Sequence, residues 1–171
     1  NKSSITNIPT KYSLLRGKNI KRYGIISSHL QEFIETSFVN KSSKKLYIEN
    51  KRICCQQISN INKEHRLIFS EVSQNYVLGN SCNFIFVDDN NKNISLDYLL
   101  GLLNSSLYNW YFKLFSSNNH INNYELRELP LPIDEQLINE ISCLVSNIKK
   151  EQSNLYFDKI DSIILNYFNN K

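Results

Sequence analysis

The spacing of the hydrophobic residues changes near residue 90, and this change constrains the fold more than any other feature of the sequence. Before it, short runs rich in β-branched and aromatic residues predict strands at 12–15, 46–49, 52–58, 66–72 and 82–87. After it, apolar residues recur every three or four positions, which is typical of amphipathic helices. Strands followed by helices predict an α+β fold, with a small mixed or antiparallel sheet and a packed helix, then two C-terminal helices.

Three helices are predicted in the second part of the chain. The first begins after its capping residue Ser95 and runs to Leu114, with Trp110 on its apolar stripe and therefore in the core. The second begins at Asp134 and the third near Ser153. Between residues 24 and 45 the pattern is ambiguous and allows a short helix that includes Leu30, Phe33, Ile34 and Phe38.

Composition narrows the classes of protein to consider. The chain has 171 residues, of which 41% are hydrophobic, so we expect one compact core rather than disorder. No apolar run approaches the ~18–20 residues of a membrane span. The four cysteines lack metal-ligand spacing and no leader segment is evident, which indicates reduced thiols and a cytoplasmic protein. Because the chain starts without Met, we expect a fragment of a longer protein.

Charge is distributed unevenly along the chain. Residues 1–66 contain 13 Lys and Arg against 4 Asp and Glu, whereas residues 67–171 contain 7 against 12. A basic block of this kind indicates a surface for a polyanion, most often nucleic acid, and a solvated lysine-rich face is the alternative. Asparagine is so frequent in this chain that its abundance adds no weight to any asparagine as a reader of adenine.

No catalytic constellation is evident in the sequence. Only four glycines are present, so there is no glycine-rich phosphate loop, and His29, His65 and His120 stand apart. Residues 49–51 (Glu-Asn-Lys) match half of a nuclease metal site, but the acidic partner expected upstream is missing because Asp88 is the first aspartate. We therefore expect that this chain catalyses no reaction itself.

Three segments, in their order and spacing, resemble a known family. They are Leu15 to Tyr23, Lys51 to Ser59 with its continuation through Arg66–Val72 and Tyr76–Phe84, and Leu99 to Leu107 with Trp110–Phe112 and Glu128–Pro132. The family is the TaqI-like C-terminal specificity domain, the target-recognition domain of type IIG restriction-modification enzymes, which is related to type I specificity subunits. Cys54 and Cys55 depart from the family's usual aliphatic or aromatic pair, which affects packing more than identity.

The resemblance implies a non-catalytic module that reads bases in the major groove of double-stranded DNA inside a bacterial cell. A methyltransferase or nuclease domain or subunit, absent from this chain, would methylate adenine N6 with S-adenosylmethionine and use Mg²⁺, so this chain needs no cofactor. We predict a recognition domain over 1–133 and a helical pair over 134–171 that packs on it or on a partner. The alternative is a protein-interaction or assembly module that uses the C-terminal helices.

The candidate DNA contacts are basic and polar residues of the N-terminal half. They are Arg16, Lys18, Lys21, Arg22, Lys44, Lys45, Lys51, Arg52, Gln56, Gln57 and Arg66. The first four form the densest basic cluster, beside a turn at Gly17, and suit phosphate contact, as do the two lysines at 44–45. Residues 51–52 and 56–57 alternate along a strand, and Arg and Gln can bond base edges. Arg66 is equally suited to a base contact and to a structural pair.

Overall fold

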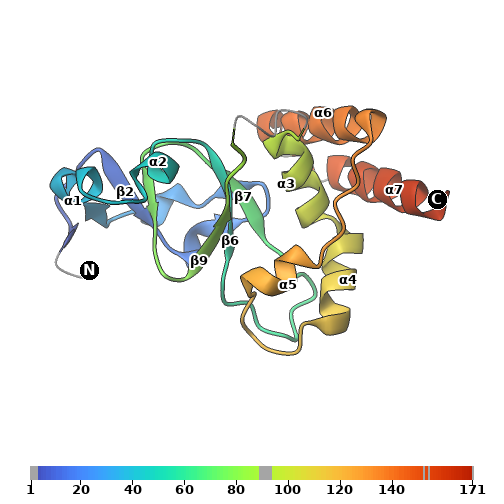
Figure 1. The fold of residues 1–171 in the computed structure, drawn as a ribbon, viewed down its shortest axis with the longest axis horizontal. Coiled ribbons are helices and arrows are strands. Elements are labelled where there is room, and N and C mark those ends of the chain that lie inside the picture. Colours follow the sequence, from blue (N-terminus) through green and yellow to red (C-terminus); the bar gives the residue numbers. More distant parts are fainter. Residues whose placement is uncertain (1–3, 89–93, 152, 154, 171) are drawn as a thin grey trace.

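The structure is a computed structural model that describes residues 4–88, 94–151, 153 and 155–170. Its strands lie toward the N-terminal end and its long helices toward the C-terminal end, which confirms the predicted α+β fold (Figure 1). The strands are β1 (Ile5–Thr6), β2 (Tyr12–Leu15), β3 (Ile20–Lys21), β4 (Gly24–Ile25), β5 (Phe33–Ile34), β6 (Arg52–Gln56), β7 (Phe69–Val72), β8 (Tyr76–Leu78) and β9 (Cys82–Ile85). The helices are α1 (Thr36–Asn40), α2 (Lys45–Ile48), α3 (Leu96–Asn104), α4 (Ser106–Phe115), α5 (Asn123–Arg127), α6 (Glu135–Glu151) and α7 (Leu155–Asn169).

The described strands form three small sheets. The first has the order β1-β5-β2-β8, in which β2 and β8 pair in parallel and the other neighbours pair antiparallel. The second is the β3-β4 hairpin, and the third is an antiparallel sheet in the order β7-β6-β9. The parallel pair brings residues 13–15 beside residues 76–78, and it thereby joins the basic N-terminal segment to the middle of the chain.

Four of the five predicted strands are confirmed: the one at 12–15 has the predicted bounds, and those at 52–58, 66–72 and 82–87 are shorter. The prediction of a strand at 46–49 is wrong, because this segment forms helix α2. Two side chains that follow the helix stabilise its end: Asn50 donates to the carbonyl of Leu46 (2.8 Å) and Arg52 donates to the carbonyl of Tyr47 (2.6 Å). The short-helix interpretation of residues 30–38 is also wrong in part, since Phe33 and Ile34 form β5 and pair with β1 and β2.

The first long helix is broken in the middle, which the hydrophobic pattern did not reveal. Ser95 caps it as predicted, because its Oγ accepts from the Tyr98 amide (3.0 Å). The helix then ends at Asn104, and Ser105 caps a new helix, α4, by accepting from the Tyr108 amide (3.2 Å). The break resets the helical phase, so Trp110 is 57% exposed and the prediction that it lies in the core is wrong.

Asn104, at the break, joins the helices to the third sheet. Its Oδ1 accepts from the Phe69 amide (2.9 Å) and its Nδ2 donates to the Phe69 carbonyl (3.0 Å), so this buried side chain pairs with the edge of β7 as a neighbouring strand would. Asn109 similarly accepts from the amides of Arg66 and Leu67. Buried backbone groups need partners of this kind because an unpaired one is costly.

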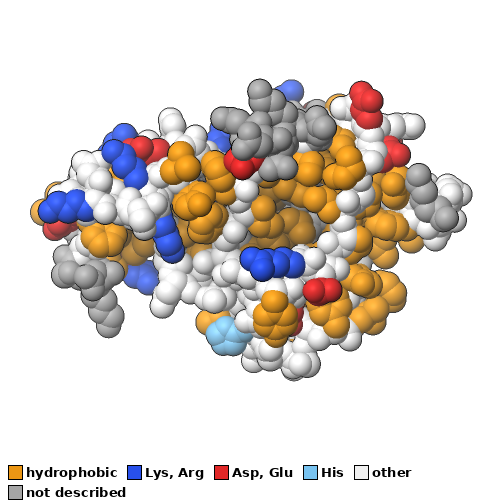
Figure 2. Space-filling view, viewed as in Figure 1, with side chains coloured by type: hydrophobic (Ala, Val, Ile, Leu, Met, Phe, Trp, Pro, Cys, Tyr) orange, Lys and Arg blue, Asp and Glu red, His pale blue; other side chains and the backbone are white. Residues whose placement is uncertain are grey.

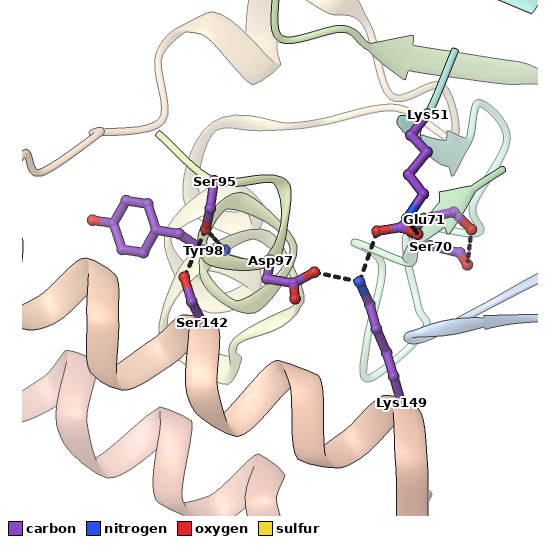
Figure 3. A network of polar contacts seen from close by, with 8 residues as sticks. All are labelled: Lys51, Ser70, Glu71, Ser95, Asp97, Tyr98, Ser142 and Lys149. Carbon is purple, nitrogen blue, oxygen red and sulfur yellow. Dashed lines mark hydrogen bonds and ion pairs between the residues drawn. The ribbon is translucent and has the colours of Figure 1, made fainter. Parts of the chain in front are cut away.

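The C-terminal helices pack on the same core as the sheet. Ile141 of α6 and Ile160 of α7 are fully buried in a cluster that contains Ile53 and Phe69. Lys149 of α6 adds polar contacts, since it donates to Asp97 of α3 and to Glu71 of β7 (2.7 Å) (Figure 3). The helical pair therefore packs on the rest of the chain, and the boundary at residue 133 stays a prediction.

Gly101 permits the close approach of α6 to α3. A Cβ at this position would lie 2.3 Å from Ile141 Cγ2, which is far inside van der Waals contact. Gly101→Ala should therefore lower the free energy of unfolding by roughly 1–2 kcal/mol in urea titrations, although alanine is the better helix former. Ile141→Ala removes the obstructing methyl, so the double variant should lose less than the sum of the two single losses. Strict additivity would contradict this account of the packing.

Candidate nucleic-acid interface

Among the basic residues of the N-terminal half, Arg52 and Arg66 are buried, whereas most lysines are exposed. Figure 2 shows that the Lys and Arg side chains on one face of the molecule gather mainly at the end formed by α1 and α2, whereas hydrophobic side chains dominate the rest of that face. The predicted DNA contacts do not form one continuous surface, because several of them point into the protein. Their individual surroundings decide which can meet a ligand.

Arg52 lies inside the protein, with a relative exposure of 1%. Its guanidinium donates to the carbonyls of Tyr47 (2.6 Å), Asn50 (3.1 Å) and Tyr76. These carbonyls belong to the end of α2 and to β8, so one side chain holds both segments in place. Burial lowers the pKa of Arg52, which is nevertheless a strong enough base to stay charged. Its role in this structure is to position backbone, not to contact a base.

Arg66 is also buried, and it contacts the segment that follows α4. It donates to the carbonyls of Ser116 (2.9 Å) and Asn118, and its guanidinium lies 5.1 Å from the centre of the Phe112 ring. The two readings of Arg66, base contact or structural pair, are thus decided in favour of the structural one. Both arginines use the several donors of the planar guanidinium to satisfy carbonyls of distant segments.

Arg16 and Arg22, from the densest basic cluster, each have a partner within the chain. Arg16 makes a two-pronged ion pair with Glu32 (2.7 and 2.8 Å) and is about one-third exposed. Arg22 donates to the Asn104 carbonyl (2.6 Å) and lies 4.8 Å from the centre of the Phe157 ring in α7. Arg22 therefore attaches the β3–β4 hairpin to the helices, while Arg16 keeps an accessible edge.

The predicted lysines, by contrast, lie mostly in solvent. Lys18, Lys21 and Lys44 are exposed, and none of them forms an ion pair with a described residue. Lys45 lies 3.9 Å from Glu49, and Lys51 lies 3.6 Å from Glu71, the carboxylate that Lys149 also contacts (Figure 3). The net positive charge available to a ligand at this end thus comes chiefly from unpaired lysines.

The two glutamines predicted as base readers are half-buried in the strand region. Gln56 donates through Nε2 to the carbonyl of Ile20 (3.0 Å), so its amide is used to hold strand β3. The Gln57 backbone bonds Ser81 and Ile121 on either side (2.9 and 2.8 Å). The Gln57 backbone thereby links the segments that contain Ser81 and Ile121. The side chains of both glutamines are only partly exposed.

A groove of about 700 Å³ lies between α2 and the turn that joins β8 to β9. Its polar lining includes Arg16, Ser42, Ser43, Lys44 and Asn80, and its apolar lining includes Phe84. Of the residues that line the groove, Arg16, Lys44 and the buried Arg52 were among the predicted contacts. The hydroxyl and amide residues were missed, because nothing in their local sequence distinguishes them from other loop residues.

The described part of the chain was also examined for side chains grouped as metal ligands. No group of three or more His, Cys, Asp or Glu side chains in it is placed to hold a metal ion. Glu49, from the weak nuclease match, instead accepts from the Tyr12 hydroxyl (3.1 Å). A search of the described helices also finds none with the length and hydropathy of a membrane span.

A comparison with protein families identifies a match that covers most of the chain. The family model described as the TaqI-like C-terminal specificity domain matches residues 12–131. The matched region contains the basic end, the groove and the broken helix α3–α4, and it stops before α6. No match was found among curated proteins.

Arg52 provides a test of the structural role assigned to the buried arginines. Arg52→Met should lower the free energy of unfolding by roughly 2–4 kcal/mol, because three buried carbonyls lose their charged donor. Arg52→Lys should not restore the lost stability, since an ammonium group cannot reproduce the planar arrangement of donors of a guanidinium. The neighbouring Lys51→Met, whose side chain is 67% exposed, is the matched control and should change stability by less than about 0.5 kcal/mol. Equal urea midpoints for the two Met variants would refute the assignment.

His65, near Arg22, should make stability depend on pH. Burial, and then the charge of Arg22, lower the pKa of His65 to about 4, whereas an unfolded histidine titrates near ~6.5. Between these two pKa values the unfolded state binds more protons than the folded state. The contribution of His65 to the free energy of unfolding is therefore fully present above pH ~6.5 and declines as the pH falls toward 4. When urea midpoints are measured at neutral and at acidic pH, the midpoint of His65→Gln should fall less between the two than that of the wild type. An identical decline would contradict the buried neutral state.

Proposed function

The chain belongs to the TaqI-like C-terminal specificity domain family, and from this membership we propose that it binds double-stranded DNA and recognises a specific sequence. It would act as the target-recognition module of a restriction-modification protein, of type IIG or a close relative. The observation that carries the proposal is the match over residues 12–131, within which Lys18, Lys21 and Lys44 lie on the surface.

The exposed lysines supply the electrostatic part of this proposal. Lys18, Lys21 and Lys44 lie on the N-terminal part of the domain without carboxylate partners among the described residues. Lysines that neutralise phosphates release condensed counterions, which drives binding to any duplex sequence. Phosphate contacts of this kind orient a protein on DNA, and additional contacts to bases provide sequence preference.

We assign no catalytic step to this chain. Methylation of adenine N6 and cleavage would take place on a separate methyltransferase or nuclease domain or subunit, which would bind S-adenosylmethionine and Mg²⁺. The recognition module would determine which adenine is presented to it. Such a protein acts on DNA in the cytoplasm of a bacterial cell, and that location is part of the proposal.

A second candidate function is assembly with a partner protein. An apolar cavity of about 710 Å³ opens between α6 and α7, and Leu155 at its rim is 59% exposed. On α4, Trp110 and Leu114 are 57% and 62% exposed. Deletion of residues 134–171 cannot test this candidate, because it would also remove Ile141 and Ile160 from the core.

The salt dependence of DNA affinity tests the first proposal. Lys18→Ala, Lys21→Ala and Lys44→Ala should each weaken binding similarly on all duplex sequences and reduce the slope of log affinity against log salt by about one. Fluorescence anisotropy with labelled duplex between about 50 and 200 mM salt measures both quantities. Lys150→Ala, an exposed lysine on α6, is the matched control and should leave the slope unchanged. Unchanged slopes in the three variants at residues 18, 21 and 44 would refute the proposed face and favour the assembly module.

A further inference from the structure

We propose that Asn80 determines base preference by contacting an adenine through its side-chain amide. This inference rests on the proposed function and adds a base-reading residue to it. Of the described residues that line the groove beside α2, Asn80 alone carries an amide. It is exposed, and no hydrogen bond to a described residue is found for its side chain.

Several asparagines of this chain use their side-chain amides within the fold, whereas Asn80 combines a free amide with a place in the groove lining. Asn19 accepts from the Arg16 amide (2.9 Å), and Asn83 donates to the Ile121 carbonyl (2.7 Å). Asn104 and Asn109 complete the edge of the sheet. An amide that the fold leaves unused, beside a groove at the basic end, remains available to a ligand.

The turn that carries Asn80 is held in place on both sides. The Gly79 amide donates to the Leu15 carbonyl (2.7 Å), and the Cys82 amide donates to the Gly79 carbonyl (3.1 Å). The Gly17 amide donates to Ser81 Oγ (2.9 Å), and a Cβ on Gly17 would lie only 2.8 Å from the Ser81 carbonyl oxygen. These close contacts fix Asn80 beside the turn that carries Lys18.

Cations lie in the groove and on the turn next to it. Lys44 lines the groove from the α2 side, and Lys18 lies on the neighbouring turn at residues 17–19. The buried Arg52 donates to carbonyls at the end of α2 and in β8, and thereby joins the two segments. Phosphates bound by the lysines would place a base edge near the amide between them.

The amide group selects the chemical class of its ligand. An asparagine side chain can donate to N7 and accept from the N6 amino group of adenine in the major groove, and no other base presents that pair of groups. Such a contact discriminates by roughly 1–3 kcal/mol, which corresponds to about 5- to 150-fold in affinity. We therefore expect one A·T pair of the recognised sequence to depend on Asn80.

The experiment selects binding sites from a randomised duplex pool at about 50 mM salt with the wild-type chain, Asn80→Ala and Asn40→Ala. Asn40 is an exposed asparagine at the end of α1 that does not line the groove, so it is the matched control. The expected result is one motif for the wild type and the control, and the same motif without preference at one A·T pair for Asn80→Ala. The salt slope of Asn80→Ala should equal that of the wild type, and its urea midpoint shows that it is folded.

A modified base identifies the contacted atom. Replacing the adenine at that pair by 7-deazaadenine removes the N7 acceptor, which should weaken wild-type binding severalfold and leave Asn80→Ala unaffected. An unchanged motif in Asn80→Ala, or a lost preference at a G·C pair, would overturn the inference while the proposed function stands. Salt-sensitive binding by the wild type without any motif would also overturn it. No binding at low salt would overturn the proposed function, and the inference with it.

Discussion

The pairing of the Asn104 amide with both backbone groups of Phe69 is the contact on which the rest of the arrangement depends. It lies where α3 ends, and it attaches the helical half to the edge of β7 at 2.9 and 3.0 Å. Arg22 donates to the carbonyl of the same asparagine, so the β3–β4 hairpin is fixed to this point as well. Sheet, hairpin and helices therefore meet at one polar junction, whose central residues Asn104 and Phe69 are buried and whose amide supplies both a donor and an acceptor.

The two kinds of basic residue have different tasks in this domain. Arg52 and Arg66 each satisfy carbonyls from segments that are far apart in the sequence, and both are essentially unexposed. The lysines at 18, 21 and 44 stay in solvent. This division follows from chemistry, because a guanidinium presents five donors in a fixed plane and tolerates partial dehydration, whereas an ammonium is strongly hydrated. The basic composition of the N-terminal half thus overstates the positive charge that a ligand would meet.

The sequence predicted the class of fold and most strands, because burial on one or both faces of a strand leaves a readable pattern. It did not predict the break at Ser105, since apolar residues continue at helical spacing on both sides and only the Asn-Ser-Ser step marks it. The burial of Arg52 was equally hidden, because it depends on the carbonyl of Tyr76, which lies 24 residues away. Asn80 gave no signal because asparagine is abundant throughout the chain, and its position beside the groove comes from tertiary contacts alone.

The parallel pairing of β2 with β8 has a consequence for how the domain is made. Strand β2 leaves the ribosome early, but its partner at residues 76–78 follows some sixty residues later, and the main core is complete only with Ile164 of α7. Contacts of such long sequence separation slow folding and keep apolar segments uncovered meanwhile. The small clusters around Tyr12 and Leu15 are complete once residue 84 has been made, whereas the main core has to wait for α7.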